Sequence, residues 1–98
     1  MATHMNSAAI NLQNRLNKAE RGDADAFYDL GIAYSVGRGD VPVDLIEAHK
    51  WFNLAAMAGN RRAQEDRAEI ASEMSAAEIA EAQRHARAWM SRTHACAA

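Results

Sequence analysis

Cysteine, proline and aromatic residues are nearly absent from this sequence. Cys96 is the only cysteine among 98 residues, so no disulfide can form within the chain. The chain has one proline, five glycines and 6% aromatic residues, so it contains few of the residue types that favour turns and β-strands. The apolar share of 49% depends mainly on alanine, and this composition predicts an all-α protein with a single core.

The sequence also lacks long apolar runs and a strong excess of one charge. No stretch approaches the roughly 20 apolar residues that cross a bilayer, and the N-terminus does not resemble a secretion signal. With 11 basic and 13 acidic residues, the formal charge is −2, which argues against binding along a phosphate backbone. We therefore expect a cytoplasmic protein that neither inserts into a membrane nor binds nucleic acid.

Apolar periodicity, together with the polar and glycine residues between the apolar stretches, predicts five helices. They cover approximately residues 7–21, 24–36, 44–59, 61–74 and 76–90. Asp23, Asp44 and Asn60 are expected to cap the second, third and fourth helices, and Ser75 with Glu78 forms a capping box before the fifth.

The sequence contains an internal repeat. Residues 18–26 match residues 55–63 at a shift of 37, which pairs Ala19 with Ala56, Gly22 with Gly59, Asp23 with Asn60 and Ala26 with Ala63. In both copies one helix ends, a tight turn follows and the next helix begins. Two helices in each period of this length are typical of stacked antiparallel helix pairs.

One stretch, residues 24–60, has small, glycine and aromatic residues at characteristic positions of two predicted helices and their loop. These residues are Ala26, Tyr28, Leu30, Gly31, Tyr34, Gly37, Gly39, Asp44, Ala48, Trp51, Ala55, Ala56 and Gly59. In their types and spacing they resemble the Sel-1-like repeat, a relative of the tetratricopeptide repeat. The resemblance implies an α/α solenoid (superhelix) of about two and a half antiparallel helix pairs, five helices in all.

The domain limits follow from this resemblance. Residues 7–92 form a single domain, in which 24–60 is the clear repeat and 7–23 and 61–92 are degenerate or capping half-repeats. Residues 1–6 are interpreted as a tag remnant or a disordered segment, and residues 93–98 as a frayed tail.

Gly31 and two tryptophans are the residues expected to determine the packing. Gly31 has no side chain and lets a neighbouring helix approach closely. Trp51 and Trp89 are expected to dominate the two halves of the core, because an indole buries roughly 150–250 Å².

The expected function is protein–protein interaction, of the adaptor or scaffold type. The second helix is expected to present Asp25, Tyr28, Asp29 and Ile32 to a partner protein or peptide. Asp25 and Asp29 lie four residues apart and would favour a basic or amphipathic partner segment. No residue is expected to be catalytic or to bind a cofactor or a metal.

A small helical enzyme or metal-binding protein is the alternative. Its weak signals are Gly37-Arg38-Gly39, which lacks the strand and lysine of a phosphate loop, and the pair His94 and Cys96. Glu81 and His85 are separated by four residues, whereas di-iron bundles use Glu-x-x-His.

Two charged features of the fourth helix are interpreted as structural. Glu65, Glu69 and Glu73 form a ladder typical of a solvated helix face, and Arg67 is expected to be a partly buried or snorkelling residue.

The first predicted helix has no preceding partner. Ile10, Leu12 and Leu16 would leave one end of the stack apolar, which predicts a homodimer through terminal helices or a folded-back N-terminus.

Overall fold

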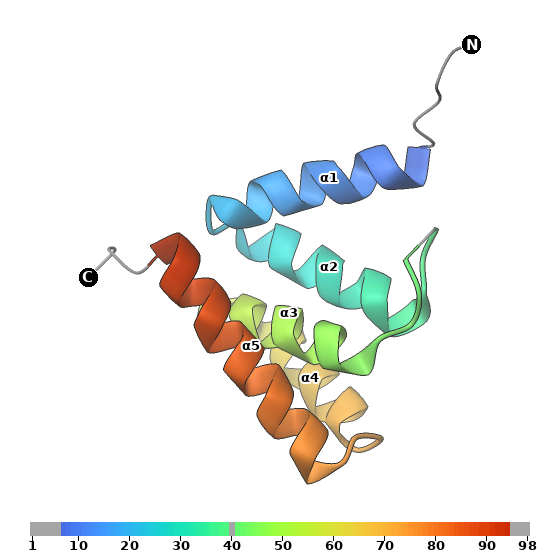
Figure 1. The fold of residues 1–98 in the computed structure, drawn as a ribbon, viewed down its shortest axis with the longest axis vertical. Helices are drawn as coiled ribbons and strands as arrows, with labels where there is room; N and C mark the ends of the chain where they lie inside the picture. The colour runs from blue at the N-terminus through green and yellow to red at the C-terminus, as the bar shows by residue number, and fades with distance from the viewer. Residues whose placement is uncertain (1–6, 40, 95–98) are drawn as a thin grey trace.

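The computed structural model describes residues 7–39 and 41–94, and the side chains of 11–39 and 41–93. Within these ranges the chain forms five helices and no strand (Figure 1). The helices are α1 (Ser7–Glu20), α2 (Ala24–Val36), α3 (Leu45–Met57), α4 (Arg61–Ala71) and α5 (Ala76–His94). The all-α prediction is confirmed for these residues. The interpretations of residues 1–6 and 95–98 lie outside them.

The third helix is the centre of the fold. α2, α4 and α5 all pack against α3, and α1 packs on α2. In Figure 1, α1 lies above α2, and α5 runs diagonally in front of α3. None of the helices in the described ranges is long and apolar enough to cross a membrane.

Each predicted cap is present. Oδ1 of Asp23 accepts hydrogen bonds from the backbone N–H groups of Asp25 (2.9 Å) and Ala26 (3.2 Å). Asp44 and Asn60 cap α3 and α4 in the same way, at 3.1 and 3.0 Å. The Ser75–Glu78 capping box is also confirmed, because each side chain accepts a hydrogen bond from the other residue's N–H, at 2.8 and 3.1 Å. These bonds satisfy amides that a helix leaves free in its first turn.

The two turns matched in the sequence have the same conformation. Gly22 and Gly59 both have positive φ, 82° and 104°, in the left-handed region where glycine is favoured. The N–H of Gly22 donates to the carbonyl of Ala19 (2.8 Å), and that of Gly59 donates to Ala56 (3.1 Å). The internal repeat is therefore present in the local geometry of both turns.

Four helix ends differ from the predicted ones. α1 ends at Glu20, α3 at Met57 and α4 at Ala71, all earlier than predicted, and α5 continues to His94, beyond the predicted end at 90. At the end of α4 the Ser72 hydroxyl donates to the carbonyl of Glu69 (2.6 Å), which uses an acceptor that a continuing helix would need. The connection from α4 to α5 therefore covers residues 72–75 and is longer than predicted.

The core contains two phenylalanines that the sequence analysis did not single out. The ring of Phe27 stacks on Trp51 with 6.0 Å between centroids, and Phe52 is 1% exposed. A Cβ placed on Gly31 would lie less than 3.0 Å from three atoms of the Phe52 ring. The close approach predicted at Gly31 is confirmed, and Phe52 is the group that approaches.

Trp51 and Trp89 belong to one cluster, not to two halves of the core. Their ring centroids lie 4.8 Å apart in an edge-to-face arrangement, because α5 crosses α3 at this point. Glu47 accepts a hydrogen bond from the Trp51 indole N–H (2.9 Å) and pairs with Lys50 (3.0 Å). The Lys50 ammonium also lies 4.3 Å from the centre of the Trp51 ring. The charge of this largely buried lysine is therefore balanced both by a carboxylate and by an aromatic ring.

The repeat positions named in the sequence analysis take up core and turn positions. Those that are buried are Ala26, Leu30, Gly31, Ala48, Trp51 and Ala55. Tyr34 and Ala56 are half-buried and pack against the core, while Gly37, Gly39 and Gly59 have positive φ in turns.

Candidate partner-binding groove

The four residues predicted to bind a partner all lie on α2, but they point toward two different neighbouring helices. Asp25 and Asp29 are exposed and line a hollow of about 370 Å³ between α1 and α2. Arg15 and Lys18 of α1 line the same hollow. Asp23 lines it too, so the hollow holds three aspartates and two cations, and its charge is mixed.

The other two predicted residues face α4. Tyr28 is half-buried: its ring lies 5.6 Å from that of Phe52, and its hydroxyl donates to Oδ2 of Asp66 at 2.6 Å. Ile32 is half-buried one turn further along α2. The structure thus separates Tyr28 and Ile32 from Asp25 and Asp29.

A hollow of about 250 Å³ lies between α2 and α4, and we call it the α2–α4 groove. Its apolar residues are Ile32, Val36, Phe52 and Ile70, and its polar residues are Ser35, Asp66, Glu69 and Glu73. Val36 is 61% exposed, which is a large apolar surface left in contact with water. All three ionisable side chains that line the groove are carboxylates.

The Tyr28–Asp66 hydrogen bond joins the two walls of this groove. It raises the pKa of the Tyr28 hydroxyl, and partial burial and the negative charge of Asp66 act in the same direction. Arg62 opposes this shift without reversing it. The hydroxyl therefore remains protonated and remains the donor at neutral pH.

The three glutamates of the predicted ladder are exposed, as expected, but Glu73 lies in the turn after α4 and not on the helix. Glu65, Glu69 and Glu73 all face solvent, but only Glu69 and Glu73 line the groove. They are free to meet a partner's cations, whereas Asp66 is held by Tyr28.

Asp66, Val36, Phe52 and Ile70 were not among the predicted binding residues. For Asp66 the repeat contained a usable signal, because it is Asp29 shifted by 37 residues along the sequence. For the apolar residues no such signal existed, because their place in the groove depends on which helix packs beside α2.

Arg67 is half-buried, as predicted, and donates a hydrogen bond to Oδ1 of Asn53 on α3. Near it His49 is 3% exposed, and its Nδ1 has no hydrogen-bond partner. Burial lowers the pKa of His49, and the positive charge of Arg67 lowers it further. His49 lines neither of the two hollows beside α2.

The weak metal signals of the sequence do not come together in the described part of the chain. No group of three or more His, Cys, Asp or Glu side chains within it is placed to hold a metal ion. Glu81 and His85 form a single surface pair at 3.5 Å, each with 44% of its side chain exposed. The pair His94 and Cys96 lies outside the described side chains.

Comparisons of the chain with protein-family models, with curated protein sequences and with solved structures return no match. The function proposed below is therefore argued from the geometry of this chain alone.

Proposed function

We propose that this protein is an interaction module that binds a basic, amphipathic segment of a partner protein in the α2–α4 groove. The observation that carries the proposal is the composition of the groove, which combines exposed apolar side chains with carboxylates only. Recognition, rather than catalysis, is the function this arrangement supports.

The apolar residues would supply most of the binding energy. Val36 and Ile32 from α2 lie in the same groove as Ile70 from α4, so the apolar face of a bound helix could cover all three at once. Covering Val36 removes from water one of the most exposed large apolar side chains of the described structure.

The carboxylates would select the partner by charge. Glu69 on α4 and Glu73 in the turn after α4 are both exposed and line the groove, so they could pair with lysines or arginines of a partner helix. Acidic segments would be repelled by the same residues.

The proposed architecture is the solenoid implied by the Sel-1-like resemblance. In it, α2 and α4 are equivalent first helices of successive antiparallel pairs, and α1 is the last helix of a preceding pair. The support is the pair of equivalent turns at Gly22 and Gly59, which start α2 and α4 in the same way.

The test is fluorescence anisotropy with the full chain and two labelled helical peptides of about 16 residues, one of leucine and lysine and one of leucine and glutamate. The basic peptide should bind, and its affinity should fall as salt is raised from about 50 to 500 mM. Glu69→Lys with Glu73→Lys should weaken its binding by about tenfold or more. Glu65→Lys should not, because Glu65 is exposed on the same helix but outside the groove.

A second pair of variants tests the apolar contribution. Val36→Asp would add a charge inside the groove, which strengthens attraction for lysine but removes apolar contact. Val36→Ser is therefore the informative change, and it should weaken binding. Val43→Ser is its matched control, because Val43 is equally exposed, at 61%, and lies outside the groove. Equal binding by all variants would contradict the proposal.

A further inference from the structure

A further hollow, of different character, lies at the end of α2 opposite the α2–α4 groove. It is lined by Gly22 of the α1–α2 turn, Phe27 of α2, Leu54 and Met57 of α3, and Trp89 and Met90 of α5. We call it the α3–α5 groove; its volume is about 230 Å³. It shares no lining residue with the α2–α4 groove.

The α3–α5 groove is apolar and partly open to water. Phe27, Leu54 and Trp89 are buried beneath it, while Met57 is 59% exposed and Met90 is half-buried. Methionine side chains are flexible and polarisable, and they adapt to differently shaped apolar groups. Such a surface suits a leucine- or phenylalanine-sized anchor of a partner.

Trp89 differs from Trp51 in the hydrogen bonding of its indole N–H. The indole N–H of Trp51 is hydrogen-bonded to Glu47 at 2.9 Å, whereas that of Trp89 is buried without an acceptor. Trp89 is therefore held by packing and by nearby cations, and no hydrogen bond from its own side chain fixes the ring.

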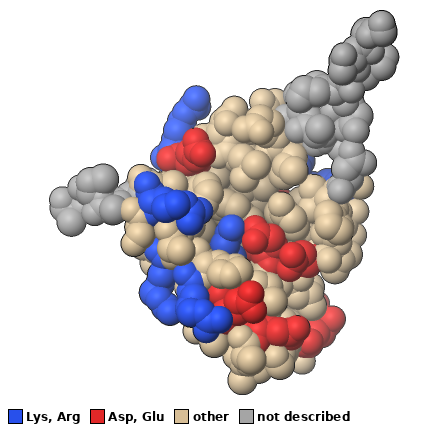
Figure 2. Space-filling model, in the orientation of Figure 1, with Lys and Arg blue, Asp and Glu red and all other residues tan. Residues whose placement is uncertain are grey.

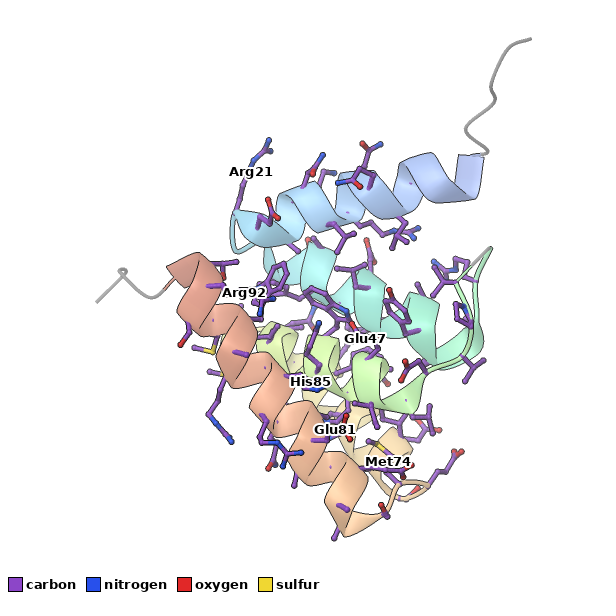
Figure 3. All side chains as sticks on the ribbon, in the orientation of Figure 1. Arg21, Glu47, Met74, Glu81, His85 and Arg92 are labelled. Carbon is purple, nitrogen blue, oxygen red and sulfur yellow. The ribbon has the colours of Figure 1, made fainter. Side chains whose placement is uncertain are left out.

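Arg92 is the exposed cation beside this groove. It lies on the last turns of α5, and its guanidinium is 5.7 Å from the centre of the Trp89 ring (Figure 3). The Lys50 ammonium lies 5.6 Å from the same ring, but it is largely buried and paired with Glu47. Arg21 extends from the α1–α2 turn away from α5 (Figure 3), and no charged side chain lines the groove itself. In Figure 2, Lys and Arg side chains gather along this edge of the molecule, and most Asp and Glu side chains lie on the remainder of the face.

We propose that the α3–α5 groove is a second docking site, which takes an acidic, amphipathic segment of a partner protein. Apolar side chains of that segment contact Met57 and Met90, and its carboxylates meet Arg92. The charge preference is opposite to that of the α2–α4 groove, so the two sites bind different segments.

The same pair of peptides tests this site independently of the first. The full chain should bind the labelled leucine–glutamate peptide, and Arg92→Glu should weaken this binding by about tenfold or more. Arg38→Glu is the control, because Arg38 is exposed on the loop after α2, outside this groove. Glu69→Lys with Glu73→Lys should leave the acidic peptide's binding undiminished, so failure of one site is distinguishable from failure of the other.

Met57→Ser tests the apolar part, with Val43→Ser as a control of similar exposure. Met57→Gln is a second choice if the first variant has an altered circular dichroism spectrum. Either variant should weaken acidic-peptide binding and reduce the accompanying change in tryptophan fluorescence, because Trp89 lines the groove. No binding of the acidic peptide, or binding unaffected by both Arg92→Glu and a folded Met57 variant, would overturn the proposal.

Two other occupants give distinct results. If a second copy of this chain fills the groove, light scattering shows a dimer that Met57→Ser dissociates. If residues 95–98 fill it, their deletion strengthens peptide binding and shifts the tryptophan emission before any peptide is added. Either result overturns the assignment to a partner protein.

Discussion

At the scale of single residues, Gly31 shows how a missing side chain determines packing. The Phe52 ring occupies the space that a Cβ would need, and Phe52 in turn packs beside Tyr28, whose hydroxyl reaches Asp66. The contact that brings α2 and α3 together is therefore connected, through two aromatic rings, to a wall of the α2–α4 groove.

Gly31→Ala should lower the free energy of unfolding. The added methyl overpacks against Phe52, which costs roughly 1–3 kcal/mol, and the better helix propensity of alanine returns about 1 kcal/mol. Urea unfolding followed by circular dichroism measures the difference. Phe52→Leu in the same chain should recover part of the loss, because it removes the obstructing ring. A stabilised Gly31→Ala variant would show that Phe52 is not where the structure places it.

His49 should make stability depend on pH. Burial and Arg67 hold its folded-state pKa below the ordinary 6.5, so the unfolded chain takes up a proton first. The contribution of His49 to the free energy of unfolding should therefore be full above about pH 7 and should decrease as pH falls below 6.5. Below the folded-state pKa of His49, this residue should cause no further decrease. Each unit of pKa difference corresponds to about 1.4 kcal/mol.

His49→Leu should flatten this dependence below pH 6.5. The measurement is urea unfolding at a series of pH values. An identical slope in the His49→Leu variant and the unaltered chain would assign the effect to other groups.

At the scale of helices, short-range hydrogen bonds determine where the chain starts and stops each element. The turns before α2 and α4 repeat the same glycine and the same capping bond, and the capping box before α5 is formed by residues three apart. What α4 lacks relative to α2 is apolar core: Arg67 stands where α2 has Leu30, and it makes a hydrogen bond to Asn53 instead.

Asn60→Ala should cost about 1 kcal/mol of stability, because the Ala63 amide loses its acceptor. Asn60→Asp keeps an acceptor in place and should cost much less. Thermal unfolding of both variants separates the stability lost with the capping hydrogen bond from other effects of the substitution. Equal losses in the two variants would mean that the side-chain oxygen does not cap α4.

At the scale of the whole molecule, α1 has a polar outer face. Leu12 and Leu16 are half-buried and pack against the core, while Gln13 and Asn17 are exposed. The apolar residues expected to lie open at the end of the stack are thus partly covered by α2; the side chain of Ile10 lies outside the described residues. The homodimer through terminal helices stays a prediction.

Light scattering after size exclusion at micromolar concentration decides the oligomeric state, with a mass of two chains expected for the dimer. Leu12→Glu with Leu16→Glu should lower the free energy of unfolding by about 1–3 kcal/mol even in a monomer, because both leucines pack on the core. Gln13→Glu with Asn17→Glu is the control on the exposed side of α1. A mass of one chain at all concentrations would contradict the dimer.

The order of residues was enough to predict the features that depend on near neighbours: the helical class, the starts of the helices, the caps at Asp23, Asp44 and Asn60, and the repeated glycine turns. These follow from hydrogen bonds between residues two to five apart, which the order of residues specifies directly. The exposed glutamates and the half-buried Arg67 followed from helical periodicity alone.

Which side chains from different helices meet depends on the fold of the whole chain. The spacing of α5 did not specify that it would cross α3 and bring Trp89 against Trp51, and no local pattern specified that Tyr28 would bond to Asp66. The same holds for α2, whose predicted binding residues divide because α1 lies on one side of them and α4 on the other. Long-range packing is chosen by the shape and burial of the whole chain, and local residue order does not contain that choice.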